Sequence, residues 1–96
     1  MLVLKILARR GPMHGYAITT HIETSSDALR VEEGSLYPAL HRLEESRLVK
    51  ARWVMTPKKR RARVYEITAA GRRRLEVDEK RWRTVAFAVG ELLERI

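Results

Sequence analysis

Cysteine is absent from the 96-residue chain, and no apolar run approaches the ~20 residues that a membrane-spanning helix needs. Without cysteine there is no disulfide framework, and a reducing cytoplasm is the simplest expected location. The N-terminal segment MLVLKILARR is not followed by a small-residue cleavage site, so nothing marks the chain for export. Its composition, 45% hydrophobic and 33% charged, is typical of one small globular domain.

Signatures of catalysis are missing as well. His14, His21 and His41 show no metal-ligand spacing. Neither a phosphate-binding loop nor a nucleophile-elbow sequence occurs. We therefore expect no enzymatic activity, no metal site and no cofactor.

Acidic residues are missing from one long stretch, residues 50–63, which holds seven basic residues. This stretch accounts for most of the net charge of +8, and such a charge favours polyanionic partners, nucleic acid first and anionic membrane second. A membrane-surface module is disfavoured because the cations do not flank a hydrophobic helix face.

Helical periodicity predicts two short helices near the N-terminus. Residues 2–9 place Val3, Ile6 and Leu7 on one side, and Gly11-Pro12 ends the helix. A second helix, with Ile18 and Ile22 one turn apart, is expected to end near residue 25. Residues 29–31 are long enough only for a brief strand.

A third helix is predicted from the spacing of Leu36, Leu40 and Leu43, which form one apolar stripe facing the core. Pro38 is tolerated only in a first turn, so the helix is expected to begin between Gly34 and Leu36. Ser35 is then the predicted N-cap. The opposite face carries Ser35, Pro38, His41, Arg42 and Glu45, with Tyr37 on its flank.

Two strands and a final helix complete the prediction. Alternation over residues 49–55 and 62–67 indicates a β-hairpin with a cationic tip, in which Trp53 is expected to be a core residue. Thr68 is the predicted N-cap of a helix that runs to about Arg95. A seven-residue repeat in this helix, broken only at Asp78, predicts a dimerisation stripe. The stripe contains Leu75, Trp82, Val85, Val89, Leu92 and Ile96.

These elements describe a mostly α fold with a small sheet (α+β). Residues 1–67 are expected to form a winged helix-turn-helix domain that binds DNA, and residues 68–96 a C-terminal dimerisation helix.

Three segments carry a resemblance to a known family: Gly11–Ile18 (GPMHGYAI), Gly34–Glu44 (GSLYPALHRLE) and Tyr65–Gly71 (YEITAAG). In this order they resemble the PadR family of bacterial transcriptional regulators, in particular its short members with one C-terminal helix. The resemblance covers most of the chain. It implies a homodimeric repressor or activator in which Ser35, Tyr37 and Pro38 enter the major groove while the wing touches the DNA backbone.

The resemblance also implies regulation either by a small, often aromatic effector held at the dimer interface or through altered dimer geometry. Trp82 could line such a pocket, and the plainer interpretation is an interface or core anchor. One departure from the family pattern is Arg47, which stands where the family typically has glycine at the helix end. A left-handed backbone there would cost on the order of 1 kcal/mol.

The candidate DNA-binding residues each have an alternative role. Ser35 could only cap its helix, Tyr37 could pack against the preceding helix, and Arg42 suits either a guanine or a phosphate. Glu32 and Glu33 are expected to be structural, because they would repel phosphate. The full set of DNA-contact candidates is Ser35, Tyr37, Pro38, His41, Arg42, Lys58, Lys59, Arg60, Arg61 and Arg63.

The predicted function is that of a sequence-specific DNA-binding regulator, expected to be a repressor, that binds double-stranded DNA as a homodimer. Two-fold symmetry predicts an inverted-repeat operator with half-sites about one helical turn, ~10 bp, apart. The alternative is a winged-helix module that uses the same surfaces for a protein partner or for RNA.

Overall fold

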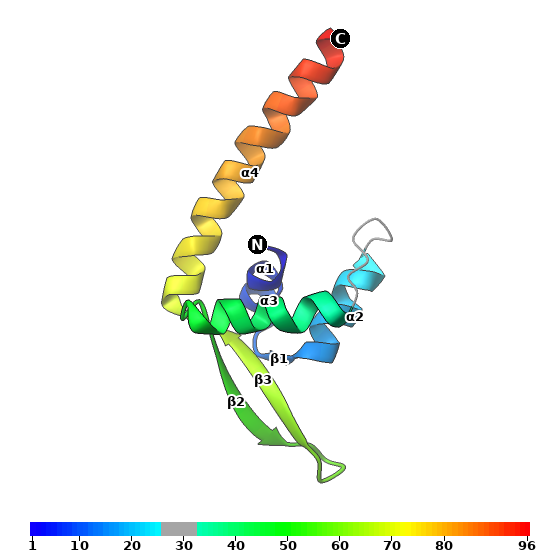
Figure 1. Ribbon diagram of the computed structural model, residues 1–96, viewed down its shortest axis with the longest axis vertical. Helices are drawn as coiled ribbons and strands as arrows, with labels where there is room; N and C mark the ends of the chain where they lie inside the picture. Colours follow the sequence, from blue (N-terminus) through cyan, green and yellow to red (C-terminus); the bar gives the residue numbers. More distant parts are fainter. Residues whose placement is uncertain (26–32) are drawn as a thin grey trace.

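The structure is a computed structural model that describes residues 1–25 and 33–96, and outside 23–35 it describes their side chains as well. The elements follow in the order α1 (Leu2–Arg10), β1 (Met13–His14), α2 (Gly15–Ser25), α3 (Glu33–Glu45), β2 (Val49–Met55), β3 (Arg61–Ile67) and α4 (Ala69–Arg95). Figure 1 shows a small core from which the β2–β3 hairpin, here called the wing, and α4 project in opposite directions. The brief strand expected at residues 29–31 lies outside the described residues.

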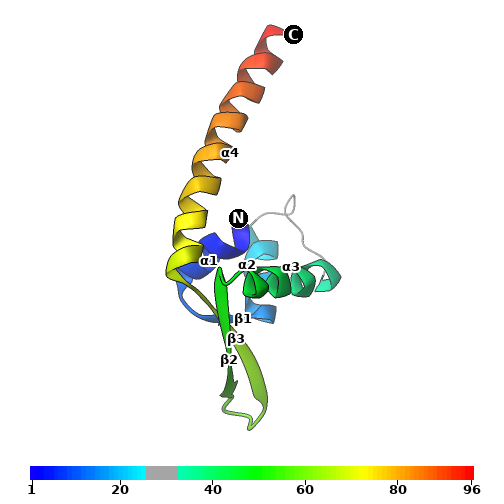
Figure 2. The same ribbon diagram turned by 60° about the vertical axis from the view of Figure 1, so that its left-hand side comes forward.

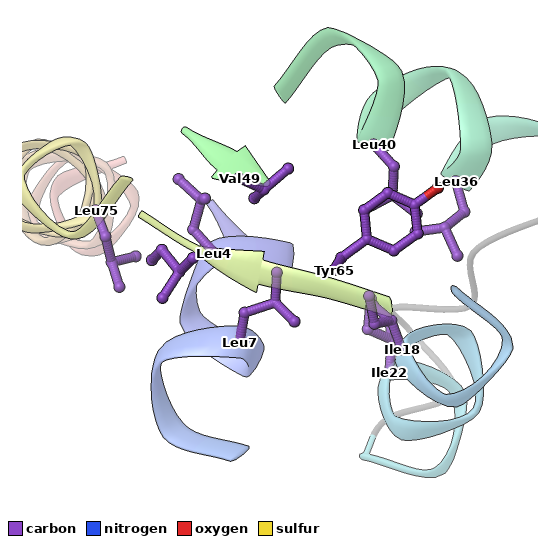
Figure 3. Packing of buried hydrophobic residues seen from close by; sticks show 10 residues of the cluster. Leu4, Leu7, Ile18, Ile22, Leu36, Leu40, Val49, Tyr65 and Leu75 are labelled. Carbon is purple, nitrogen blue, oxygen red and sulfur yellow. The ribbon is translucent and has the colours of Figure 1, made fainter. Parts of the chain in front are cut away.

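The core is formed where α1, α2 and α3 meet the base of the sheet and the first turns of α4 (Figure 3). The predicted stripe of α3 faces it, since Leu36 and Leu40 are buried and Leu43 packs partly buried against them. Full burial of such a side chain is worth roughly 1.5–3 kcal/mol. The buried cluster comprises Leu4, Leu7, Ile18, Ile22, Leu36, Leu40, Val49, Tyr65, Ile67 and Leu75.

The start of α3 differs from the prediction. The helix begins at Glu33, so Pro38 lies in its second turn and Ser35 is inside the helix. Ser35 is therefore not the N-cap. Pro38 removes one backbone hydrogen bond, and the buried leucines on either side of it hold the helix together across that gap.

The end of α3 closes in a Schellman motif. The Leu48 amide donates to the Leu43 carbonyl at 2.9 Å, and the Arg47 amide donates to the Glu44 carbonyl at 3.0 Å. Arg47 has φ 60, which is the left-handed conformation that this motif requires. The chain thus takes the turn without the glycine that would adopt it most easily.

The sheet has three antiparallel strands in the order β1-β3-β2. The wing has the predicted hairpin form, with Val49 opposite Ile67 and Met55 opposite Arg61. The sequence did not predict β1, which pairs Met13 with Tyr65 and His14 with Val64. This strand ties the start of α2 to the wing.

Trp53 is not a core residue, which corrects the prediction. Its side chain is 56% exposed, because the wing extends past the core and α3 covers only its base. The indole instead packs beneath two guanidinium groups, with its ring centre 4.8 Å from Arg61 Cζ and 5.6 Å from Arg63 Cζ.

The start of α4 is fixed against the end of α3. As predicted, Thr68 is the N-cap, and its hydroxyl accepts a hydrogen bond from the Gly71 amide at 3.0 Å while donating toward the Arg47 and Leu48 carbonyls. A Cβ atom at Gly71 would lie 2.1 Å from the Leu48 carbonyl oxygen. Only glycine lets α4 begin at this point.

Within the described residues, no helix is both long and apolar enough to cross a bilayer.

Candidate nucleic-acid interface

The outer face of α3 is exposed, as its amphipathic pattern predicted. Tyr37 is 51% exposed, and Pro38 and His41 are exposed beside it. Figure 2 shows α3 lying beside the base of the wing. The side chain of Ser35, another candidate on this helix, lies outside the described residues.

Tyr37 rests on the start of α2. A Cβ atom at Gly15 would lie 2.9 Å from Tyr37 Cε1 and 3.2 Å from its hydroxyl oxygen, so the bare Gly15 backbone is the surface that receives the tyrosine ring. His14, beside it, caps α2 by accepting a hydrogen bond from the Ala17 amide at Nδ1, at 3.2 Å. Sequence reasoning missed the role of Gly15, because the two residues are far apart in the chain.

A groove of about 640 Å³ lies between the start of α2, α3 and the wing. Aromatic side chains from the helices and cations from the wing form its walls. The groove brings together several of the predicted DNA-contact residues. Its lining is His14, Gly15, Tyr16, Tyr37, Thr56, Pro57, Lys58, Arg60, Arg61, Ala62, Arg63 and Tyr65.

The wing tip is built to present cations. Pro57 follows Thr56 in a tight turn in which the Lys59 amide donates to the Thr56 carbonyl at 2.9 Å, and the Thr56 amide donates to the Arg60 carbonyl at 2.8 Å. Lys59 has φ 58, a position that glycine usually fills in this type of hairpin. Lys58, Lys59 and Arg60 are exposed, and no carboxylate of the described residues forms an ion pair with them.

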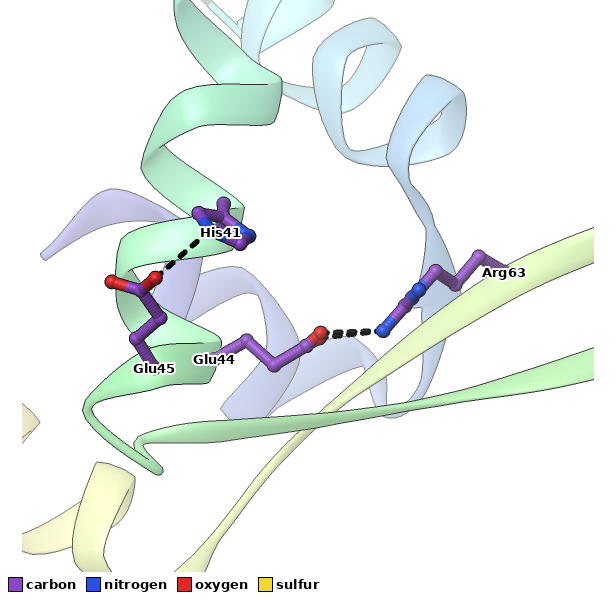
Figure 4. A network of polar contacts seen from close by, with 4 residues as sticks. All are labelled: His41, Glu44, Glu45 and Arg63. Atoms are coloured by element: carbon purple, nitrogen blue, oxygen red, sulfur yellow. Dashed lines mark hydrogen bonds and ion pairs between the residues drawn. The ribbon is translucent and has the colours of Figure 1, made fainter.

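Two of the predicted contact residues are engaged with carboxylates of α3 (Figure 4). His41 Nε2 lies 2.9 Å from Glu45 Oε1 within the helix. Arg63, on β3, directs Nη2 to both carboxylate oxygens of Glu44, at 2.5 and 2.6 Å. Arg63 is thus less free to meet DNA than the cations at the wing tip.

Arg42 is exposed but lies apart from the groove. It borders a second cavity of about 580 Å³ between α1, α3 and α4, together with Leu2, Leu43 and Arg74. The helical count places Arg42 on the outer face, and the structure places it toward the side of that face nearest α1. It is therefore separated from Tyr37 and the wing cations.

Beneath α3, Tyr65 joins the wing to the core. Its ring lies beside Leu36 and Leu40 (Figure 3), and it is 8% exposed. Burial raises the pKa of the Tyr65 phenol above its ordinary value. We find no group of three or more candidate metal ligands among the described residues.

The predicted dimerisation stripe lies on the part of α4 that leaves the core. Trp82, Val85, Val89 and Leu92 are between 47% and 57% exposed, and Ile96 is 92% exposed. Leu75 is the exception. It is 7% exposed and packs in the core of its own chain, so it is not available to a second copy.

Trp82 lies where α4 passes the start of α1. It borders a small cavity of about 230 Å³ with Met1, Leu2 and Lys5. Lys5 Nζ lies 2.7 Å from Glu79 Oε1 at the same place, and the hydrogen bond from Lys5 lowers the pKa of the Glu79 carboxyl. This ion pair fastens α1 to α4 just below the exposed stripe.

The model of the transcriptional regulator PadR-like family matches residues 3–77, most of the chain. The chain belongs to this family. A PadR family transcriptional regulator from Eggerthella lenta has a similar crystal structure, with a TM-score of 0.81 and 32% identity over 97% of this chain and 81% of that one. One from Clostridium difficile has a TM-score of 0.84 with 26% identity, over 96% of this chain and 94% of the other.

Two further likenesses are partial. Bacillus subtilis PadR, crystallised in complex with operator DNA, has the same fold with a TM-score of 0.70 and 24% identity, over 78% of this chain and 41% of that one. An uncharacterized 37.1 kDa protein in transposon TN4556 of Streptomyces fradiae is 49% identical over 79% of this chain. The chain spans only 20% of the length of that curated relative.

Proposed function

We propose that the protein is a sequence-specific DNA-binding regulator, and a repressor, that inserts α3 into the major groove and lays the wing on the phosphate backbone. The observation that carries this proposal is the groove in which the exposed side of α3 meets the unpaired cations of the wing tip. Membership of a family of transcriptional regulators supports it. Bacillus subtilis PadR, which has the same fold, was crystallised in complex with operator DNA, and this supports DNA as the partner.

Different residues supply selectivity and affinity in this proposal. Tyr37, Pro38 and His41 face base-pair edges, with Ser35 toward the start of the same helix. The wing-tip cations Lys58, Lys59, Arg60 and Arg61 contact phosphates, which add affinity without reading sequence. Arg42, on the far side of α3, is placed to meet a guanine or a phosphate beyond the groove.

The exposed stripe of α4 supplies the second half of the proposal. An apolar surface on α4 is exposed to water, which is unfavourable, and a second copy of the same helix can cover it. It consists of Trp82, Val85, Val89, Leu92 and Ile96. A two-fold dimer carries two α3 helices. Its operator is then an inverted repeat with half-sites about 10 bp apart.

A mobility-shift comparison tests the proposal. The duplex of the protein's own promoter, a scrambled duplex of equal length and a structured RNA are titrated at several salt concentrations. We expect the promoter duplex to bind most tightly. Equal binding of all three would contradict sequence specificity, and preferential binding of the RNA would favour an RNA-binding module instead.

The wing is tested by replacing Lys58, Lys59, Arg60 and Arg61 with alanine. Each lost phosphate contact is expected to reduce the slope of log K against log salt by about 0.9, so the four together flatten it by up to about 3.6. The preference for promoter over scrambled duplex is expected to remain, since α3 is unchanged. If the variant has the same salt slope as the wild type, the wing does not contact phosphates.

A further inference from the structure

We propose that Glu44 and Arg63, with Trp53 behind them, form a brace that holds the wing at a fixed position relative to α3. Arg63 is then a positioning residue and not a phosphate contact. This inference rests on the proposed DNA-binding function, since the brace sets where the wing reaches the backbone while α3 occupies the major groove.

The brace joins two elements that are otherwise held only at their base. Glu44 lies in the last turn of α3 and Arg63 lies midway along β3, and one Nη2 atom serves both carboxylate oxygens at 2.5 and 2.6 Å (Figure 4). Among the described residues it is the only ion pair between α3 and the wing. The remaining pairs lie within one helix, within the wing or between α1 and α4.

Trp53 confines the guanidinium from the other side. It lies directly opposite Arg63 in the β2–β3 register, and residues opposite each other share one face of the sheet. The indole centre is 5.6 Å from Arg63 Cζ, so the guanidinium is held between a ring and a carboxylate. Arg61 also lies over this ring, at 4.8 Å, but it has no carboxylate partner among the described side chains.

Charge separates the two arginines further. Glu44 neutralises Arg63, so the pair adds no net charge to the DNA-facing surface and releases no counterion on binding. Arg61 lines the groove, and no carboxylate among the described side chains neutralises it. The slope of affinity against salt counts phosphate contacts, and it therefore distinguishes a brace from a contact.

The wing needs such a brace because it is long and covered only at its base. Beyond Tyr65 and Ala51 the face that looks toward α3 is occupied by Trp53, Arg63, Met55 and Arg61, and Trp53 and Met55 are 56% and 66% exposed. Among the described residues, none of these four belongs to the buried core. The ion pair is the contact that determines the angle between the hairpin and the recognition helix.

The test compares wild type, Glu44→Gln, Arg63→Gln, the double variant and a charge swap that combines Glu44→Arg with Arg63→Glu. Affinity for the promoter duplex is measured against salt, and the protected backbone is mapped by hydroxyl-radical footprinting. Glu66→Gln is the matched control. Like Glu44→Gln, it removes one negative charge, but it breaks no contact with α3. Glu66 lies on the wing, and its Oε1 is 3.4 Å from Lys50 Nζ.

A brace predicts that both single variants bind about 5- to 10-fold more weakly with the wild-type salt slope, since each breaks the same contact. The double variant should be no weaker than either, and the swap should recover most of the loss. Footprints of the single variants should show the wing's protection displaced along the backbone, with the same number of phosphate contacts, and the protection by α3 unchanged. Glu66→Gln should match the wild type in footprint.

Two results overturn the inference in distinguishable ways. If Arg63→Gln reduces the salt slope by about 0.9 while Glu44→Gln binds as tightly as wild type or more tightly, Arg63 is a phosphate contact and the brace is refuted. If the wild-type protein binds no duplex, the proposed function fails and the brace falls with it.

Discussion

The wing and the outer part of α4 both leave the core, and they expose opposite chemistry. The wing is a hydrogen-bonded hairpin with cations at its tip, and no acidic residue occurs between Lys50 and Arg63. The outer α4 instead exposes large apolar side chains from Trp82 to Ile96. The two project in opposite directions, along the longest dimension of the molecule, 58 Å (Figure 1).

The difference indicates what each element meets. The core of the chain does not bury the side chains of a projecting element. These side chains are therefore exposed to solvent unless a partner covers them. Unpaired cations suit a polyanion, and an apolar stripe suits another apolar surface. These surfaces are consistent with the proposal that the wing meets DNA and the outer α4 meets a second copy. The following substitutions test this division, beginning with the largest expected effect.

The stripe of α4 is tested by Val89→Glu. In a symmetric dimer the change buries a carboxylate twice and removes two buried valines, which should cost at least about 4 kcal/mol, roughly 1,000-fold in the dimer dissociation constant. Sedimentation velocity measures it. Phe87→Glu is the matched control, because Phe87 lies about 160° around the helix from Val89 and is 71% exposed. Equal dissociation of both variants would contradict the stripe.

The joint from which both projections start is tested by Gly71→Ala. The new Cβ would lie 2.1 Å from a backbone oxygen at Leu48, so the free energy of unfolding should fall by about 3 kcal/mol. Gly90→Ala, in the exposed part of the same helix, meets nothing within 4 Å and should raise it by about 0.5–1 kcal/mol. Urea unfolding of both variants is the measurement. Equal changes in the free energy of unfolding would contradict the close approach of Gly71 to the Leu48 carbonyl.

The contact beneath Tyr37 is tested by Gly15→Ala. The added methyl group displaces the tyrosine ring, so promoter affinity should fall by about 10-fold, a change of about 1.4 kcal/mol. The fold should be nearly unaffected, because a side chain moves and no backbone does. In a Tyr37→Ala background the same substitution should have no further effect on binding. An undiminished loss in that background would mean that Gly15 acts independently of Tyr37.

The smallest effects are expected at the two left-handed residues, Arg47 and Lys59, whose φ values are 60 and 58. Replacing either by glycine should raise the free energy of unfolding by about 1 kcal/mol. Lys59→Gly should also reduce the salt slope of DNA binding by about 0.9, because it removes a wing-tip cation. Arg47→Gly should leave the slope unchanged. The same slope in both variants would show that Lys59 does not contact phosphate.

Local signals in the sequence predicted much of this fold. Thr68 caps α4 as expected because its position is set by neighbours within one turn. Leu36 and Leu40 face the core because helical spacing fixes their side. The cationic hairpin tip likewise follows from alternation that ends at a proline-containing turn.

Long-range contacts account for what the sequence did not predict. The two-residue β1 is too short to show a period, and Trp53 alternates correctly but lies beyond the edge of the core. Glu44 and Arg63 are 19 residues apart and meet only because α3 crosses the base of the wing. Leu75 was assigned to the predicted dimerisation stripe but packs in the core of its own chain, because periodicity does not distinguish it from the exposed Trp82 two turns later.

Selection of bound sequences from a random duplex pool tests the central claim most directly. A dimer that presents two copies of α3 should enrich an inverted repeat whose half-sites lie about 10 bp apart. The wing-tip alanine variant should enrich the same repeat with weaker binding. A pool that shows no enrichment, or enrichment of a single site without symmetry, would contradict the account.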